Sequence, residues 1–261
     1  MRAFKCDDLY RHRALSGLDG STHHSRVVFQ RSKPSRKSGS YVSTLWSLDT
    51  STHGARARQL TAATSSASSA CIAPSDQRVA FLSQREDDSD KQVYVIPIDG
   101  GEARRVTRDA NGLSTLLQWS HDGSRLLALQ DCPWAEDDHD DTKAKNRPLV
   151  VRSLPWKHDG SSVGAGFRTR LVEIDAASGE LRTLASGDFN VADAAWSPDG
   201  ATLVYARTPS GTQRHASELW QAAGDGGDAR CIDTFQSLSG MTFSPDGGTL
   251  AFRARGSRAS R

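Results

Sequence analysis

The sequence predicts an all-β fold made of repeated four-stranded sheets. Two kinds of segment recur along the chain in a fixed order, at a spacing of roughly 40 to 50 residues. The first is a turn of the type Ser-x-Asp-Gly with a strand-like segment on each side, and the second is a further pair of strand-like segments. Because this spacing is typical of propellers and related arrays, the fold class that we expect is a β-propeller.

The turn of the first segment predicts a β-hairpin. In Ser197-Pro198-Asp199-Gly200, proline presets φ at the second turn position and glycine suits the fourth position of a type I turn. An aromatic residue precedes the turn in three copies, and a short apolar strand follows the turn in every copy. The four copies lie at residues 71–81, 119–129, 196–206 and 243–252.

The second kind of segment completes each sheet. An apolar strand that ends in aspartate comes first, as in residues 93–99, and another strand follows a turn that contains glycine, as in residues 103–107. Two hairpins in succession give the four-stranded sheet that forms one propeller blade. Because Asx side chains bond to the backbone two residues further on, turns are expected to start at the aspartates that end the third strands. These aspartates are Asp49, Asp99 and Asp175.

The repeats supply about four and a half blades, so the predicted propeller is incomplete. After an N-terminal segment, residues 1–25, blades are expected at residues 26–60, 71–107, 118–185 and 195–233, and residues 240–254 begin a further blade. Propellers usually close with about 4 to 8 blades, and a half blade leaves an open strand edge. We therefore expect a fragment or a truncated product, with a four-bladed ring closed by the N-terminal segment as the alternative.

Two copies of the turn depart from the repeated pattern. Leu18-Asp19-Gly20 is interpreted as a degenerate turn of the first unit. In the second blade, Asp76 is interpreted as the turn aspartate, with Gln77 in place of the glycine. Single blades vary, so both departures are compatible with the propeller.

Composition and charge indicate a soluble globular protein. The 261 residues are 36% hydrophobic and 25% charged, which is enough for a packed core. A net charge of +2 indicates neither a nucleic-acid nor a membrane partner, and no apolar run approaches the roughly 20 residues of a membrane helix. The first ten residues have no apolar core of a secretory signal, so a cytoplasmic location is expected. Reduced thiols are expected at the scattered cysteines, Cys6, Cys71, Cys132 and Cys231.

Two polar stretches interrupt the blades. Residues 31–40 form a basic loop in the first blade, and residues 131–168 form an insertion within the third blade. The acidic run at residues 136–141 lacks the spacing and the turn glycine of a calcium loop, so we expect a solvated loop there. The candidate ligands of the insertion, His139, His158 and Asp159, have no ligand spacing, and no metal site is predicted.

One catalytic pattern occurs in the insertion and is rejected. Gly160-Ser161-Ser162-Val163-Gly164 matches the nucleophile elbow of α/β-hydrolases, which requires a turn from a strand into a helix. Here residues 165–174 lead directly into a strand. A small enzyme that uses Ser162 therefore remains the weakest alternative. No phosphate-binding, zinc or dinucleotide motif is present either, so no catalytic, cofactor-binding or metal residue is predicted.

The chain resembles the N-terminal propeller of prolyl oligopeptidase family serine peptidases, and their acylaminoacyl-peptidase branch in particular. The repeated Trp-Ser-Pro-Asp-Gly hairpins, residues 4–18 and residues 92–107 carry the resemblance. So does the long insertion with Trp156-Lys157-His158-Asp159-Gly160 before the strand at residues 171–175. TolB-type propellers share the hairpin motif, so order, insertion and N-terminal segment together make the resemblance specific.

The resemblance implies a division of labour between two domains. In such enzymes the propeller caps a C-terminal α/β-hydrolase domain, limits entry to short peptides and leaves the serine, aspartate and histidine to the hydrolase domain. None of those three positions is found in this chain, so it is expected to gate the substrate and to be inactive alone, and whether it counts as an enzyme is left open. The implied partners are short peptides and the hydrolase domain, and self-association is expected. The alternative is a free-standing TolB-like propeller that serves as a protein- or ligand-binding scaffold.

Overall fold

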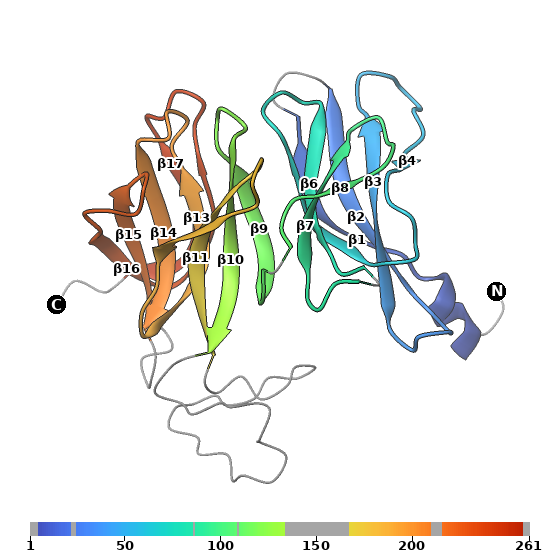
Figure 1. Ribbon diagram of the computed structural model, residues 1–261, viewed down its shortest axis with the longest axis horizontal. Helices are drawn as coiled ribbons and strands as arrows, with labels where there is room; N and C mark the ends of the chain where they lie inside the picture. The colour runs from blue at the N-terminus through green and yellow to red at the C-terminus, as the bar shows by residue number, and fades with distance from the viewer. Residues whose placement is uncertain are drawn as a thin grey trace, which may run out of the picture. The chain divides into compact units, whose positions relative to one another are not determined.

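The computed structural model describes residues 5–21, 25–85, 87–108, 110–133, 167–209 and 216–257. Its strands form four antiparallel sheets with their members in sequence order, and the first sheet follows a short 3-10 helix, η1 (Cys6–Arg11) (Figure 1). The first sheet consists of β1 (Ala14–Gly20), β2 (Arg26–Pro34), β3 (Tyr41–Asp49) and β4 (Arg58–Gln59). The second consists of β5 (Ala67–Ile72), β6 (Arg78–Ser83), β7 (Gln92–Pro97) and β8 (Arg104–Arg105).

The other two sheets repeat this pattern. The third consists of β9 (Leu113–Trp119), β10 (Arg125–Pro133), β11 (Phe167–Asp175) and β12 (Leu181–Ala185). The fourth has five strands: β13 (Phe189–Trp196), β14 (Thr202–Pro209), β15 (Ser217–Ala223), β16 (Arg230–Phe243) and β17 (Leu250–Ser257). The predicted class, an all-β propeller with blades of this size, is confirmed. The chain divides into two units, one of residues 1–126 with 175–180 and one of residues 127–174 with 181–261.

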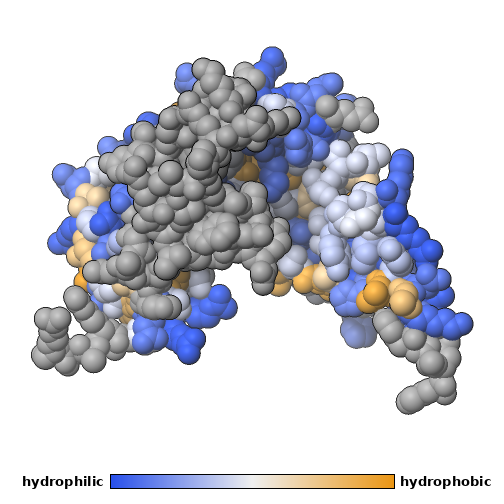
Figure 2. All heavy atoms as spheres, turned by 90° about the horizontal axis from the view of Figure 1, so that it is seen from below, coloured by the Kyte–Doolittle hydropathy of each residue, from blue (hydrophilic) through white to orange (hydrophobic). Residues whose placement is uncertain are grey.

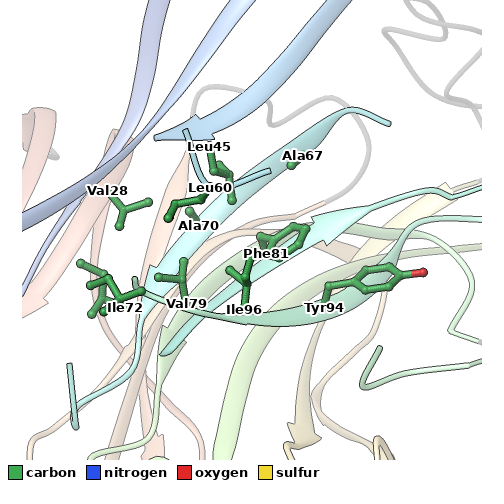
Figure 3. Packing of buried hydrophobic residues seen from close by; sticks show 11 residues of the cluster. Val28, Leu45, Leu60, Ala67, Ala70, Ile72, Val79, Phe81, Tyr94 and Ile96 are labelled. Carbon is green, nitrogen blue, oxygen red and sulfur yellow. The ribbon is translucent and has the colours of Figure 1, made fainter. Parts of the chain in front are cut away.

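In the first unit, the core lies between the first and second sheets (Figure 3). Val28 and Leu45 of the first sheet meet Val79 and Phe81 of the second, and all four side chains are at most 1% exposed. Phe81 and its cross-strand neighbour Tyr94 stack with ring centroids 5.8 Å apart. In β6 and β7 the side chains on the opposite face, such as Ala80 and Leu82, are buried as well, so the second sheet is covered on both faces.

In the second unit, the end of the chain packs on the fourth sheet. Leu238 and Met241 of β16 join a buried cluster with Ala195, Val204 and Leu219. Asp193 also holds this part of the chain, because its Oδ2 accepts hydrogen bonds from the backbone N–H groups of Gly240 (2.6 Å) and Met241 (3.1 Å).

The segment interpreted as the start of a further blade, residues 240–254, is continuous with the fourth sheet. β16 pairs with β15 through residues 230–235 and with β17 through residues 235–243. No glycine or proline interrupts residues 230–239, so one strand passes from the first pairing to the second without a turn. β17 is consequently the fifth strand of this sheet.

The repeated turns share one hydrogen-bonding pattern. In the third sheet, the Ser120 hydroxyl donates to Asp122 Oδ1 over 2.6 Å, and the same oxygen accepts the Ser124 N–H over 3.0 Å. Gly123 follows with φ +68°. The serines of the later copies, Ser197 and Ser244, donate to the aspartates two residues further on in the same way. The phrase Ser-x-Asp-Gly is therefore a turn closed by its own side chains.

The two degenerate turns are placed differently from the prediction. Asp76 donates its N–H to the Ala73 carbonyl (2.8 Å), as Gly123 does to Ser120, and has φ 56°. It therefore occupies the glycine position, which aspartate tolerates better than most residues. Leu18-Asp19-Gly20 lies in β1, and the turn starts at Ser21, whose N–H bonds to the Arg26 carbonyl. Both interpretations were wrong. The turn at Asp76 is displaced by one residue from the predicted position, and Leu18-Asp19-Gly20 belongs to a strand and not to a turn.

Two of the aspartates at the ends of third strands start turns as predicted. Asp49 Oδ1 accepts the Ser51 N–H over 2.9 Å, and Asp175 Oδ1 accepts the Ser178 N–H over 2.7 Å. The hydrogen bond from the Ser51 hydroxyl, followed by that from the Ser51 N–H, lowers the pKa of Asp49, and the hydrogen bond from the Ser178 N–H lowers the pKa of Asp175. Asp99 differs, because its carboxylate forms an ion pair with Arg26.

Candidate functional site

The polar residues singled out in the insertion lie outside the described residues. This applies to the acidic run at residues 136–141, to His139, His158 and Asp159, and to Ser162. The four cysteines are all free thiols. Burial raises the pKa of the Cys71 thiol, which makes this cysteine a poor nucleophile.

Within the residues that the structure describes, no group of three or more metal-ligating side chains comes together. No helix there is both long and apolar enough to cross a bilayer.

The basic loop predicted at residues 31–40 is shorter than expected. β2 extends to Pro34 and β3 begins at Tyr41, so the loop comprises residues 35–40. Arg36 fixes it to η1, because its guanidinium lies 4.5 Å from the centroid of the Tyr10 ring and 2.6 Å from Asp7 Oδ1. Figure 2 shows one face of the molecule, on which hydrophobic side chains are exposed in small groups among hydrophilic ones.

A pocket of about 270 Å³ lies within the first unit, where four segments meet. One wall is the connection between the first two sheets, residues 60–67, and the others are residues 81–85, Ile96 and residues 101–103. The connection is fixed at two points. Leu45 donates its N–H to Thr61 Oγ1 over 2.9 Å, and the Ser83 hydroxyl donates to the Ser66 carbonyl over 3.0 Å. The walls of the pocket are thus tied to the sheets on both sides.

The floor and the rim of the pocket differ in chemistry. Phe81, Ile96 and Ala67 form an apolar floor, and each is at most 2% exposed. Arg85 and Glu102 are the charged residues of the rim, and both are exposed. Within the described part of the chain, neither of these two side chains has an ion-pair partner. An apolar floor with a few polar groups at the edge is the usual make-up of a small-molecule site.

A buried aspartate positions the arginine of this pocket. Asp88, whose side chain is 1% exposed, accepts hydrogen bonds at Oδ2 from the Arg85 N–H (2.9 Å) and from the Tyr94 hydroxyl (2.8 Å). Its Oδ1 lies 3.0 Å from Arg105 Nη1. The guanidinium of Arg85 in turn lies 4.1 Å from the centroid of the Tyr94 ring. Backbone and side chain of Arg85 are therefore both held by the same pair, Asp88 and Tyr94.

Tyr94 stays a neutral hydrogen-bond donor in this arrangement. Burial, followed by the hydrogen bond to Asp88, raises the pKa of Tyr94 to about 12. The ring thus presents an uncharged face to Arg85 at physiological pH, which suits a cation–π contact.

Sequence reasoning did not find this pocket. Its residues come from four separate segments that form no motif, and Arg85 and Glu102 belong to two different loops between strands. Among the segments that line the pocket, the sequence pattern identifies the apolar strand of residues 93–99. That pattern predicts a strand of the sheet but gives no indication of a pocket.

Comparisons with known proteins agree with the repeats. No family model matches the sequence. An uncharacterized peptidase of Bacillus subtilis, YuxL, is 32% identical over 184 residues, which are 69% of this chain and 27% of that protein. The Pyrococcus horikoshii acylaminoacyl peptidase superposes with a TM-score of 0.63 at 16% identity, over 86% of this chain and 33% of that one. TolB from Acinetobacter baumannii superposes with a TM-score of 0.59 at 12% identity, over 91% and 48%.

These findings define the chain first as a β-propeller domain of the type shared by peptidases and TolB. The similarity to YuxL narrows this class. The chain is a propeller domain of the peptidase family of the acylaminoacyl peptidases and prolyl oligopeptidases. It spans about a quarter of the length of YuxL and a third of the acylaminoacyl peptidase.

Proposed function

We propose that the chain is the substrate-gating propeller of a serine peptidase of the acylaminoacyl-peptidase type, which acts on short peptides. The similarity to YuxL over 184 residues carries this proposal. It implies an α/β-hydrolase domain as the partner that supplies the catalytic serine, histidine and aspartate. The propeller alone is proposed to be inactive, since none of its residues matches a position of that triad.

The proposed place of action is the cytoplasm. All four cysteines are free, and two of them, Cys6 and Cys231, are exposed. Exposed free thiols persist in a reducing compartment and are uncommon in secreted proteins.

The gating proposal is tested by the length of the peptides that are cleaved. The part of YuxL that lies outside the matched region would be expressed alone and fused behind this chain, and both proteins assayed on an acetylated dipeptide anilide and on a much longer unfolded polypeptide. We expect the fusion to cleave the short substrate and to spare the long one, while the chain by itself cleaves neither. Equal cleavage of the long substrate by both proteins would count against gating. Hydrolysis by the chain alone would contradict its proposed inactivity.

A free-standing binding scaffold is the second candidate. It is favoured by the TolB structures, which superpose on 87% and 91% of this chain. The two functions predict different native proteins. A scaffold works without a hydrolase domain, whereas a gating propeller belongs to a polypeptide that includes one. Immunoprecipitation of the native protein from cell extract, followed by peptide mass mapping, distinguishes them, because peptides of a hydrolase domain in the same polypeptide agree only with gating.

A further inference from the structure

We propose that the pocket formed by residues 60–67, 81–85, Ile96 and residues 101–103 binds a small zwitterion, namely a dipeptide with an apolar side chain. The pocket joins an apolar floor to one cationic and one anionic side chain, Arg85 and Glu102. A ligand that satisfies all three features carries a carboxylate, an ammonium group and an apolar body. This inference does not depend on the proposed gating function, because it concerns the propeller alone.

The register of the second sheet separates the two charges. Ser83, two residues before Arg85, pairs with Gln92 at the start of β7, and the Arg85 guanidinium lies over Tyr94. Glu102 lies in the loop that follows the other end of β7. The two charged groups therefore reach the pocket from opposite ends of one strand. In a single amino acid the ammonium and carboxylate groups share one carbon atom, whereas a dipeptide places its two charges at opposite ends of the molecule, as two groups that approach from opposite ends of a strand require.

The apolar floor and the volume limit the size of the ligand. The largest floor residues, Phe81 and Ile96, are 1% and 2% exposed and belong to the core of the first unit (Figure 3). A pocket of about 270 Å³ lies just below the range of small-molecule sites, roughly 300 to 1,000 Å³. It suits a dipeptide with one aliphatic side chain and excludes a folded partner.

Arg85 is held in place before any ligand arrives. Its backbone N–H is bound to Asp88, and its guanidinium is stacked on Tyr94, whose hydroxyl also bonds to Asp88. Stacking on the ring leaves the N–H edges of the guanidinium free to donate to a carboxylate in a bidentate manner. A positioned arginine loses less side-chain entropy on binding than a mobile one.

The binding test uses the purified 261-residue chain and isothermal titration calorimetry with L-alanyl-L-leucine. We expect saturable binding with a Kd on the order of 1 mM, as befits a ligand of this size. Two analogues each lack one charge: N-acetyl-alanyl-leucine has no ammonium group, and alanyl-leucinamide has no carboxylate. Each is expected to bind about tenfold more weakly than the dipeptide, because one charge-assisted hydrogen bond is lost. Equal binding of all three compounds, or no saturable binding of the dipeptide, would overturn the proposal.

Two variants assign each charge to its residue. Arg85→Gln should weaken binding of the dipeptide about tenfold and leave binding of the leucinamide unchanged, since that analogue has no carboxylate. Glu102→Gln should weaken the dipeptide equally and leave the acetylated analogue unchanged. Arg56→Gln and Glu180→Gln are matched controls at exposed sites outside the pocket and should bind like the unchanged chain. If Arg85→Gln fails to fold, the Glu102→Gln comparison still decides, because Glu102 lies in an exposed loop.

Discussion

The carboxylate of Asp19 accepts a hydrogen bond of 2.6 Å from the backbone N–H of Ile72. Asp19 lies in β1 and Ile72 in β5, so this contact joins the first strands of two successive sheets. Asp193 in β13 likewise accepts hydrogen bonds from Gly240 and Met241 of β16, a strand of its own sheet with which β13 forms no ladder. A carboxylate on the first strand of one sheet thus satisfies backbone donors of the segment that packs against it. Sheets in a propeller have no ladder between them, so side chains must supply such polar contacts.

Replacing Asp19 with alanine is expected to destabilise the first unit. The Ile72 N–H would lose its acceptor in a partly buried position, at a cost of about 1 to 3 kcal/mol. Asp19→Asn keeps an acceptor oxygen and should cost less. Urea unfolding of the three proteins checks this order, and an alanine variant as stable as the unchanged chain would contradict it.

The turn carboxylate of Asp122 is expected to make stability depend on pH at the acidic end. Hydrogen bonds from Ser120 and then Ser124 lower the pKa of Asp122 to about 2, from an unperturbed value of 3.8. A group with a depressed folded pKa stabilises the fold above its unfolded pKa, and this contribution disappears as the pH falls through the folded value. Stability should therefore decline between about pH 4 and pH 2.

The measurement is the urea midpoint at a series of pH values for the unchanged chain and for Asp122→Asn. The variant has no ionisable group at this position, so its midpoint should fall less steeply between those pH values. Asp87→Asn is a control at an exposed aspartate outside the repeated turns. An unchanged slope in Asp122→Asn would show that the turn carboxylate does not contribute.

Much of the fold is visible in the sequence because the repeat is local. The Ser-x-Asp-Gly turn closes through its own side chains, as between Ser120 and Asp122, so its sequence specifies its structure. Asp76 was assigned to the wrong turn position because it follows a proline and a serine, as the turn aspartates of two other copies do. Its φ of 56° shows that it stands at the glycine position. The continuity of β16 was also not predictable, since it depends on which neighbours its two halves find.

The pocket illustrates the opposite case. Arg85 is held at the pocket by two contacts. Its backbone N–H bonds to the buried carboxylate of Asp88, and its guanidinium stacks on the ring of Tyr94 in the next strand. Glu102 reaches it from another loop. These relations follow from strand register and from packing between sheets, and neither is encoded by a local spacing of residues.

The tryptophan before the third turn is expected to be a major stabilising residue of the second unit. Trp196 is 2% exposed, and its indole N–H donates to the Gly224 carbonyl over 2.9 Å. Trp196→Ala should cost about 3 to 5 kcal/mol, because it leaves a large cavity and an unsatisfied carbonyl. Trp196→Phe keeps most of the ring and loses the hydrogen bond, for which about 1 to 2 kcal/mol is expected. Chemical unfolding followed by circular dichroism measures both, and a smaller loss in alanine than in phenylalanine would contradict the assignment.

Self-association of the isolated chain is the remaining prediction, and it follows from the strand edges. β1 and β17 are the outermost strands in the orders of their sheets. On β1, Leu15 and Leu18 are 67% and 73% exposed. Unpaired backbone groups beside exposed leucines favour pairing with another chain.

Sedimentation velocity over a range of concentrations should show reversible oligomers. The double substitution Leu15→Lys with Leu18→Lys should shift them toward monomer, since lysine on an edge strand opposes pairing. A double substitution at exposed polar positions outside the strands, Ser38→Lys with Thr50→Lys, adds the same two charges away from the leucines and serves as the control. A chain that sediments as a monomer at every concentration would contradict the prediction, and association unaffected by the leucine substitutions would assign it to another surface.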